Sequence, residues 1–368
     1  GLMIISSLNA VTNLDIEYFE MHLNKRNIVF DLFNWIPMFI FFLISQRYLG
    51  TSKNRLLFTK VLIAGSIPVI ISCFLQYFFK IYGPFEVLNG LIIWFQYPRN
   101  GSEITGLFSN QNYTGIWLTI LLPFVILEFK SFTKNKFKKS FLALVLISTI
   151  FFTFLTYSRN ALLGLLITFC IAYEVKYLIA IPFLYIFSLI SFKIISNNFF
   201  QSYLLKDNSF INKIFYNSLD FTSPSYSRIE GYSIALKGIF EEPVLGWGAT
   251  VFPHFYEMQG GIWAVRHTHN MPLEIAFNYG LPTSLLLTAF VLLLIINAFR
   301  KTKTNFFKKN LSTIDQAWIT ATLIVLISHI FDLTYYDGKI NILIWILLAG
   351  LKCIIDDNKN KKDFISTN

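Results

Sequence analysis

Repeated apolar runs, most of them close to the length of a membrane span, restrict the fold of this chain more than any other feature. A helix needs about 20 mostly apolar residues to cross the hydrocarbon core of a bilayer. Only 14% of the 368 residues are charged, and the mean hydropathy is +0.54. The candidate spans are 28–45, 61–80, 113–129, 141–157, 161–175, 177–195, 281–299, 315–332 and 339–355. The sequence therefore predicts an all-α, polytopic transmembrane helix bundle in a lipid bilayer, with residues 1–368 as a single integral-membrane domain.

The connections between these runs predict the orientation of the chain. Lys and Arg gather in cytoplasmic connections of membrane proteins. Of the 31 basic residues, 19 lie in 46–60, 130–140, 300–309, the C-terminal tail and at Lys176. Nine spans place all five regions on one side, which we assign to the cytoplasm. This distribution explains the net charge of +10 without a nucleic-acid partner. Because only Lys176 separates 161–175 from 177–195, a tight turn or a re-entrant pair is an alternative there.

The long connection 196–280 falls on the opposite, extracytoplasmic side and is predicted to carry part of a functional site. Long connections with structure of their own are usually functional. Ser223 and Pro224 are typical of a helix start, and apolar residues then recur at helical spacing up to Pro243. This helix is amphipathic and suited to a membrane surface. A second helix is predicted to begin after Asn270, a favourable N-cap residue, with Pro272 in its first turn.

Two arginines on the predicted extracytoplasmic side call for an explanation. Arg159 follows Ser158 between two apolar runs, where a charge costs about 2.5–3.5 kcal/mol at a helix centre. Arg228 lies in the first turn of the predicted helix, where the helix dipole disfavours a cation. Both positions suit an anion site. The structural alternatives are that Arg159 extends to the lipid headgroups and that Arg228 pairs with Glu230 or Glu257.

A histidine pair, His267 and His269, comes just before the second predicted helix. In an extended segment both side chains would point the same way. Three interpretations stay open at this stage: structural hydrogen bonding, a general base, or a metal site, for which the sequence shows no third ligand nearby. A further polar segment runs from Arg99 to Asn112 and enters a span. Asn112 there is either part of a site or simply an N-cap.

Four segments in this order resemble the O-antigen ligase and Wzy-type polymerase superfamily. They are GLFSNQN at 106–112, TYSRNALLGLL at 156–166, SRIEGYSIALKGIFEEPVLGWG at 227–248 and HTHNMPLEIAFNYGLPTSLLL at 267–287. The resemblance covers roughly 100–300; outside it the chain matches only as hydrophobic spans. The family has more spans, near twelve, so the region before residue 28 is expected to be divergent or truncated.

The resemblance implies a GT-C-like membrane glycosyltransferase that acts on the periplasmic face of the bacterial inner membrane. It implies a polyprenyl-diphosphate-linked glycan as donor, and a glycan or lipid A-core hydroxyl as acceptor. No cofactor, metal or nucleotide is expected. Arg159 and Arg228 would bind the diphosphate, and His269 would be the base with His267 supporting it. Supporting roles are expected for Arg99, Asn112, Ser158, Asn270 and Glu274.

Several functional alternatives remain open from the sequence alone. Within the superfamily these are ligase, polymerase and protein glycosylation, because the acceptor groove cannot be read from one sequence. Outside it, a transporter or flippase of lipid-linked oligosaccharides is the main rival, since Pro37, Pro68, Pro123 and Pro182 interrupt predicted spans. Clustered Arg and His on one side favour the transferase.

Overall fold

The computed structural model describes residues 1–13, 24–83, 86–93, 103–131, 135–173, 228–261, 265–306 and 313–366. Arg99, the predicted span 177–195 and the loop up to residue 227, including Ser223 and Pro224, lie outside them. The described chain is all-α, as predicted, apart from two paired two-residue strands, β1 (Glu86–Val87) and β2 (Ile92–Ile93).

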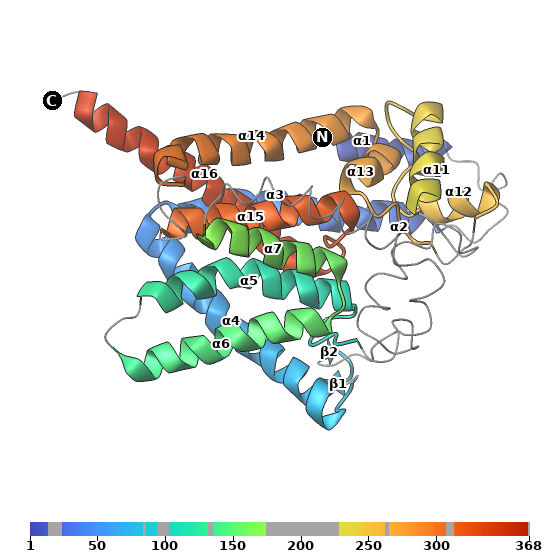
Figure 1. Ribbon diagram of the computed structural model, residues 1–368. Coiled ribbons are helices and arrows are strands. Elements are labelled where there is room, and N and C mark those ends of the chain that lie inside the picture. The colour runs from blue at the N-terminus through green and yellow to red at the C-terminus, as the bar shows by residue number, and fades with distance from the viewer. Residues whose placement is uncertain are drawn as a thin grey trace, which may run out of the picture. The chain divides into compact units, whose positions relative to one another are not determined.

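The chain forms two compact units, each assembled from separate segments. The first comprises Gly1–Arg47, Phe221–Ile296 and Leu326–Ala349, and the second comprises Tyr48–Asp220, Asn297–Val325 and Gly350–Asn368. The prediction of one integral-membrane domain over 1–368 stays a prediction. Figure 1 shows the helices of both units with their labels.

The first unit begins with helices that lead into a membrane span. These are α1 (Leu2–Asn13), α2 (Lys25–Phe30), the 3₁₀ turn η2 (Asp31–Asn34) and most of α3 (Ile36–Leu49). The middle of the chain adds α11 (Arg228–Glu241), α12 (Phe252–Met258) and α13 (Met271–Tyr279). The second unit contains α4 (Ser52–Phe79), α5 (Gln111–Ser131), α6 (Lys136–Leu155) and α7 (Arg159–Tyr173). Three long helices contribute to both units: α14 (Leu281–Phe306), α15 (Ile314–Phe331) and α16 (Gly338–Ser366).

Seven helices among the described residues are long and apolar enough to cross a membrane. They are Lys25–Leu49, Ser52–Phe79, Gln111–Ser131, Lys136–Leu155, Leu281–Thr302, Ile314–Phe331 and Gly338–Asp357. Each matches one of the nine predicted runs, so the protein is a multi-pass membrane protein. The predicted run 161–175 corresponds to a shorter apolar helix, Arg159–Ala172.

A small aromatic core joins the three short helices of the first unit. Gly238 on α11 lies so close to the Phe277 ring that a Cβ there would be 2.5 Å from it. Gly246 has a φ of +69°, and the chain then returns along α13, where the Trp247 amide donates to the Phe277 carbonyl at 2.8 Å. The PVLGWG segment therefore needs its glycines to hold α11 against the helix that follows the histidine pair.

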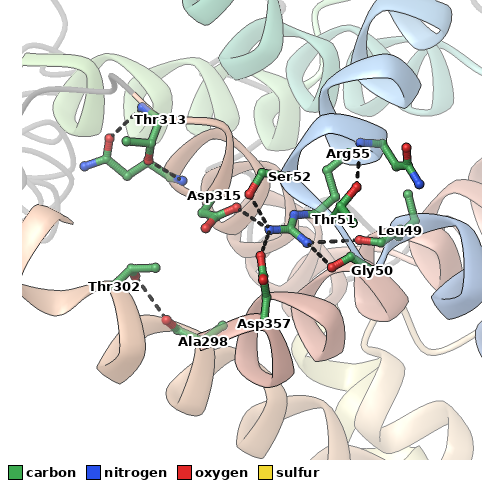
Figure 2. A network of polar contacts seen from close by, with 12 residues as sticks. Leu49, Gly50, Thr51, Ser52, Arg55, Ala298, Thr302, Thr313, Asp315 and Asp357 are labelled. Atoms are coloured by element: carbon green, nitrogen blue, oxygen red, sulfur yellow. Dashed lines mark hydrogen bonds and ion pairs between the residues drawn. The ribbon is translucent and has the colours of Figure 1, made fainter. Parts of the chain in front are cut away.

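A buried arginine ties together residues from four helices, α3, α4, α15 and α16, within the second unit (Figure 2). The Arg55 side chain is 0% exposed, and its Nη2 lies 3.0 Å from Asp315 and 3.3 Å from Asp357. Nη1 donates to the Leu49 carbonyl at 3.0 Å, and Nη2 donates to Ser52 Oγ at 3.1 Å. The planar guanidinium suits this arrangement because it presents several donors in one fixed fork.

Candidate active site

The histidine pair lies on the short segment that leads into α13. Asn270 is the N-cap residue, as predicted: its Oδ1 accepts from the Leu273 amide at 3.0 Å, and Pro272 lies in the first turn. Asn270 also donates from Nδ2 to the Ile330 carbonyl at 3.0 Å. This one side chain therefore fixes both the start of α13 and its contact with the end of α15.

The two imidazoles meet, although the segment is not extended. His269 has a φ of +55°, in the left-handed region that a non-glycine residue seldom adopts. The ring centroids of His267 and His269 are 4.2 Å apart in an edge-to-face arrangement. The expectation of a shared direction assumed an extended segment; in the structure a turn at His269 brings the two rings together instead.

Glu274 holds this turn from inside. Its side chain is buried, and its two oxygens accept from the Thr268 amide at 2.9 Å and from the Tyr336 hydroxyl at 3.0 Å. Burial raises the pKa of Glu274, and these hydrogen bonds partly counter the rise. Tyr336 in turn stacks on the His267 ring, with centroids 6.0 Å apart. Glu274 therefore positions both histidines without contacting either ring.

Asp332 provides the partner of His269. It follows α15 directly, and its Oδ1 lies 3.2 Å from His269 Nδ1. Burial alone would raise the pKa of Asp332, but the hydrogen bond and charge of His269 outweigh it and lower the pKa to about 2. Asp332 is therefore ionised at neutral pH and can only accept a hydrogen bond. The proton of a neutral His269 then resides on Nδ1, and Nε2 becomes the basic atom of the ring.

His267 lies in a different environment from His269. The pKa of His267 is lowered to about 4, mainly by burial. The nearby His269 and Arg228 also lower this pKa, whereas Asp332 raises it. Its Nδ1 is buried and has no hydrogen-bond partner among the residues that the structure describes. His267 is thus a neutral imidazole at physiological pH, beside a histidine that is paired with a carboxylate.

Arg228, the first described residue of α11, belongs to the same electrostatic environment. The charge of Arg228 lowers the pKa of His267. Burial raises the pKa of Tyr232, one helical turn further along, and Arg228 partly counters this rise. The charge of Asp332 raises the pKa of the same tyrosine. The first unit therefore brings together a cation, a histidine–aspartate pair and a second imidazole from three separate stretches of the chain.

The same groups also have the composition of a metal site. One ligand atom each from His267, His269 and Asp332 lie within 4.8 Å of one another. No third ligand was evident from the sequence, and Asp332 supplies one. Two imidazoles and a carboxylate would suit zinc. The arrangement is therefore compatible with either a proton-transfer pair or a metal centre. An activity measurement with and without a chelator distinguishes the two.

The other predicted site residues lie in the second unit, where two motifs meet. Gly115 on α5 lies so close to α7 that a Cβ there would be 2.6 Å from Ala161 and 3.1 Å from Ser158. The buried Ser158 accepts from the Ala161 amide at 3.4 Å, so it caps the helix that begins at Arg159. Arg159 is exposed. The helix starts that carry Asn112 and Arg159 thus lie together.

One sequence-based alternative is corrected here. Asn112 does not cap α5, because the helix already begins at Gln111. The side chain of Asn110 accepts from the Asn112 amide at 2.8 Å, which is the geometry of an N-cap. Asn112 is therefore the second residue of α5 and not its cap.

Asp332 and Tyr336 were not singled out in the sequence. Both lie in the short turn 332–337 after a span, which the predicted topology places on the same side as His269. The sequence did contain a signal for Asp332: it is an acidic residue at the end of a span, on the side of the membrane predicted for the histidine pair. The roles of Arg99 cannot be placed, because it lies outside the described residues.

The described residues thus form a multi-pass membrane protein whose first unit carries a histidine–aspartate pair, with an arginine in electrostatic range of the neighbouring His267. Residues 142–288 match the family model described as O-antigen ligase. This match confirms the resemblance to the O-antigen ligase and Wzy superfamily and covers α7, α11 and α13. It indicates glycosyl transfer in general, between a lipid-linked glycan and an acceptor. No curated protein matches the chain.

Proposed function

We propose that this protein transfers a glycan from a polyprenyl diphosphate to an acceptor hydroxyl on the periplasmic face of the bacterial inner membrane. The reaction would be inverting and independent of metal. The observation that supports this most is the His269–Asp332 pair, 3.2 Å apart, with Arg228 in electrostatic range of the adjacent His267. The pair supplies a base and Arg228 supplies a cation, which are the two groups that attack by a hydroxyl on a sugar diphosphate requires.

The chemistry follows from the protonation states. The acceptor oxygen forms a bond to the anomeric carbon while the bond from that carbon to the diphosphate oxygen breaks. The hydroxyl proton passes to His269 Nε2, and Asp332 stabilises the imidazolium that results. Arg228 binds the departing diphosphate through charge-assisted hydrogen bonds. Diphosphate leaves readily as an anion, so the protein needs no acid to protonate it.

An apolar cavity in the first unit supports a lipid-linked donor. Its volume is about 630 Å³, and residues of α1, α3 and α14 line it. Trp35 lines the cavity and also packs against Tyr335, with ring centroids 5.0 Å apart, and Tyr335 stacks on Tyr336. A continuous aromatic contact therefore links this space to the Tyr336 ring that covers His267. A polyprenyl chain is the part of the donor that such a space would accommodate.

Arg159 is proposed as the second diphosphate ligand on the family resemblance. Supporting roles are proposed for Ser158, Asn112, Asn270, Glu274 and Arg99, with His267 assisting His269. Ligase and polymerase activity differ only in the acceptor, lipid A-core or a further glycan unit. A transporter of lipid-linked glycans is the rival function, and it would move the donor without forming a product.

The decisive experiment is transfer in vitro with the purified chain, a polyprenyl-diphosphate glycan and a series of acceptors. Product should form in the presence of EDTA, and its anomeric configuration should be the inverse of the donor. Asp332→Asn should lower the rate about 10²-fold or more at unchanged protein yield, because the amide no longer fixes the Nδ1–H tautomer. Tyr232→Phe serves as a control variant in the same environment.

Two outcomes would contradict the proposal. Donor movement between leaflets without any new glycosidic bond would favour a transporter. Activity that is lost with EDTA and restored by Zn²⁺ would assign His267, His269 and Asp332 to a metal centre.

A further inference from the structure

The exposed side of α11 is divided into an apolar strip and a polar strip. Ile229, Leu236 and Phe240 are 62%, 42% and 77% exposed. At 3.6 residues per turn they lie within about 40° of one another around the helix. The adjoining exposed arc carries Lys237 and Glu241. A third arc, which includes Gly238, packs against Phe277 and Phe255. An exposed surface that is itself two-sided is typical of a helix lying between lipid and water.

The end of α11 is joined to the start of a membrane span. The Leu281 amide, at the first residue of α14, donates to the Pro243 carbonyl at 2.8 Å. Val244, which follows α11 and is 63% exposed, has its backbone carbonyl packed against Gly280. Leu285, on the first turns of that span, is 65% exposed and faces outward. Exposed apolar side chains thus lie both on α11 and on the span to which the end of α11 is joined.

The direction of α11 agrees with this connection. Figure 1 shows α11 running across the direction of α14 rather than alongside it. A helix whose end is held at the start of a span, and which runs across that span, extends along the plane of the membrane. Large exposed apolar strips rarely face water, and within the part of the chain that the structure describes the position of the helix favours the bilayer surface as the partner of its apolar strip.

We propose that α11 is an in-plane interfacial helix, with Ile229, Leu236 and Phe240 inserted among the lipid chains and Lys237 and Glu241 in water. The partner is the bilayer surface. Together with the proposed function, on which this consequence rests, the arrangement places Arg228 at the depth of lipid phosphates. The diphosphate of a membrane-bound donor would then reach Arg228 without leaving the interface.

Fluorescence quenching in nanodiscs tests the placement without any activity measurement. Phe240→Cys and Glu241→Cys are adjacent, and about 100° apart around the helix. Each is labelled with the environment-sensitive dye NBD, and the wild-type chain labelled in parallel gives the background of Cys73, Cys170 and Cys353. At position 240 the dye should lose most of its emission to brominated lipids and little to iodide. At position 241 the order should be reversed. Leu236→Cys repeats the lipid-facing measurement.

Two results would overturn the proposal. Equal iodide quenching at 240 and 241 would place the strip in water, and protection of position 240 from both quenchers would mean that protein covers it. A separate arm tests the consequence for the donor. Phe240→Lys should raise the apparent KM for the lipid-linked donor several-fold at unchanged kcat, whereas Glu241→Gln, with the same change in charge, should not. If the protein shows no transfer at all, the quenching result still stands and only the proposed function fails.

Discussion

Arg55 in the second unit and His269 in the first unit are both held by aspartates, but they differ in how their polar atoms are used. Arg55 in the second unit is 0% exposed and is bound by two carboxylates, a hydroxyl and backbone carbonyls. His269 in the first unit is 26% exposed and is bound by Asp332 through Nδ1. The contacts of Nη1 and Nη2 hold Arg55 away from solvent, so we expect a structural role for it. A partly exposed imidazole that is fixed at one nitrogen is the arrangement that a proton-transfer group requires, so we expect a catalytic role for His269.

The largest effect expected is on activity. His269→Ala should lower glycan transfer about 10²- to 10⁴-fold, the usual contribution of a general base. The amount of folded protein, measured by size-exclusion chromatography in detergent, should not change. The comparison fails if His269→Ala abolishes folding, or if transfer continues at the wild-type rate.

Arg55→Ala should show the opposite pattern. Removing one partner of a buried ion cluster costs about 3–5 kcal/mol, because Asp315 and Asp357 lose their shared cation. Thermal unfolding should shift strongly downward, while the protein that remains folded should keep its kcat. Arg55→Lys, which keeps the charge but not the fork, should fall between the two. A folded Arg55→Ala protein with normal stability and no activity would assign Arg55 to the catalytic machinery.

A smaller effect is expected on the pH dependence of stability. Because the pKa of His267 is about 4 when folded and 6.5 when unconstrained, the unfolded state binds more protons between these values. The stability that this group contributes is complete above pH 6.5 and is lost as the pH falls toward 4. His267→Gln should therefore reduce the fall in melting temperature between pH 7 and pH 5. An unchanged slope would show that His267 is not buried as a neutral ring.

The smallest effect is expected at the N-cap of α13. Asn270→Ala removes the hydrogen bond to the Leu273 amide and should cost about 1 kcal/mol of stability. Asn270→Asp should recover most of it, because the carboxylate also caps. Thermal unfolding measures both. If Asn270→Asp is folded but inactive while Asn270→Ala is active, the residue acts through something other than capping.

Local features of the fold could be predicted from the sequence because their signals are contiguous. Apolar runs predicted seven spans that the structure confirms, and Asn270 with Pro272 predicted the start of α13. The sequence could not distinguish Asn110 from Asn112 as the cap of α5, because both are asparagine, a favourable cap residue.

The sequence by itself determined that the chain is a multi-pass membrane protein and that His267 and His269 lie next to a helix start. Only the tertiary structure paired His269 with Asp332, which is 63 residues away, and placed Glu274 and Tyr336 behind the pair. The physical reason is that hydropathy and capping are read within one contiguous segment, about 20 residues for a span and a single turn for a cap. Which carboxylate meets which imidazole depends instead on how helix ends pack, and no local pattern in the sequence records that.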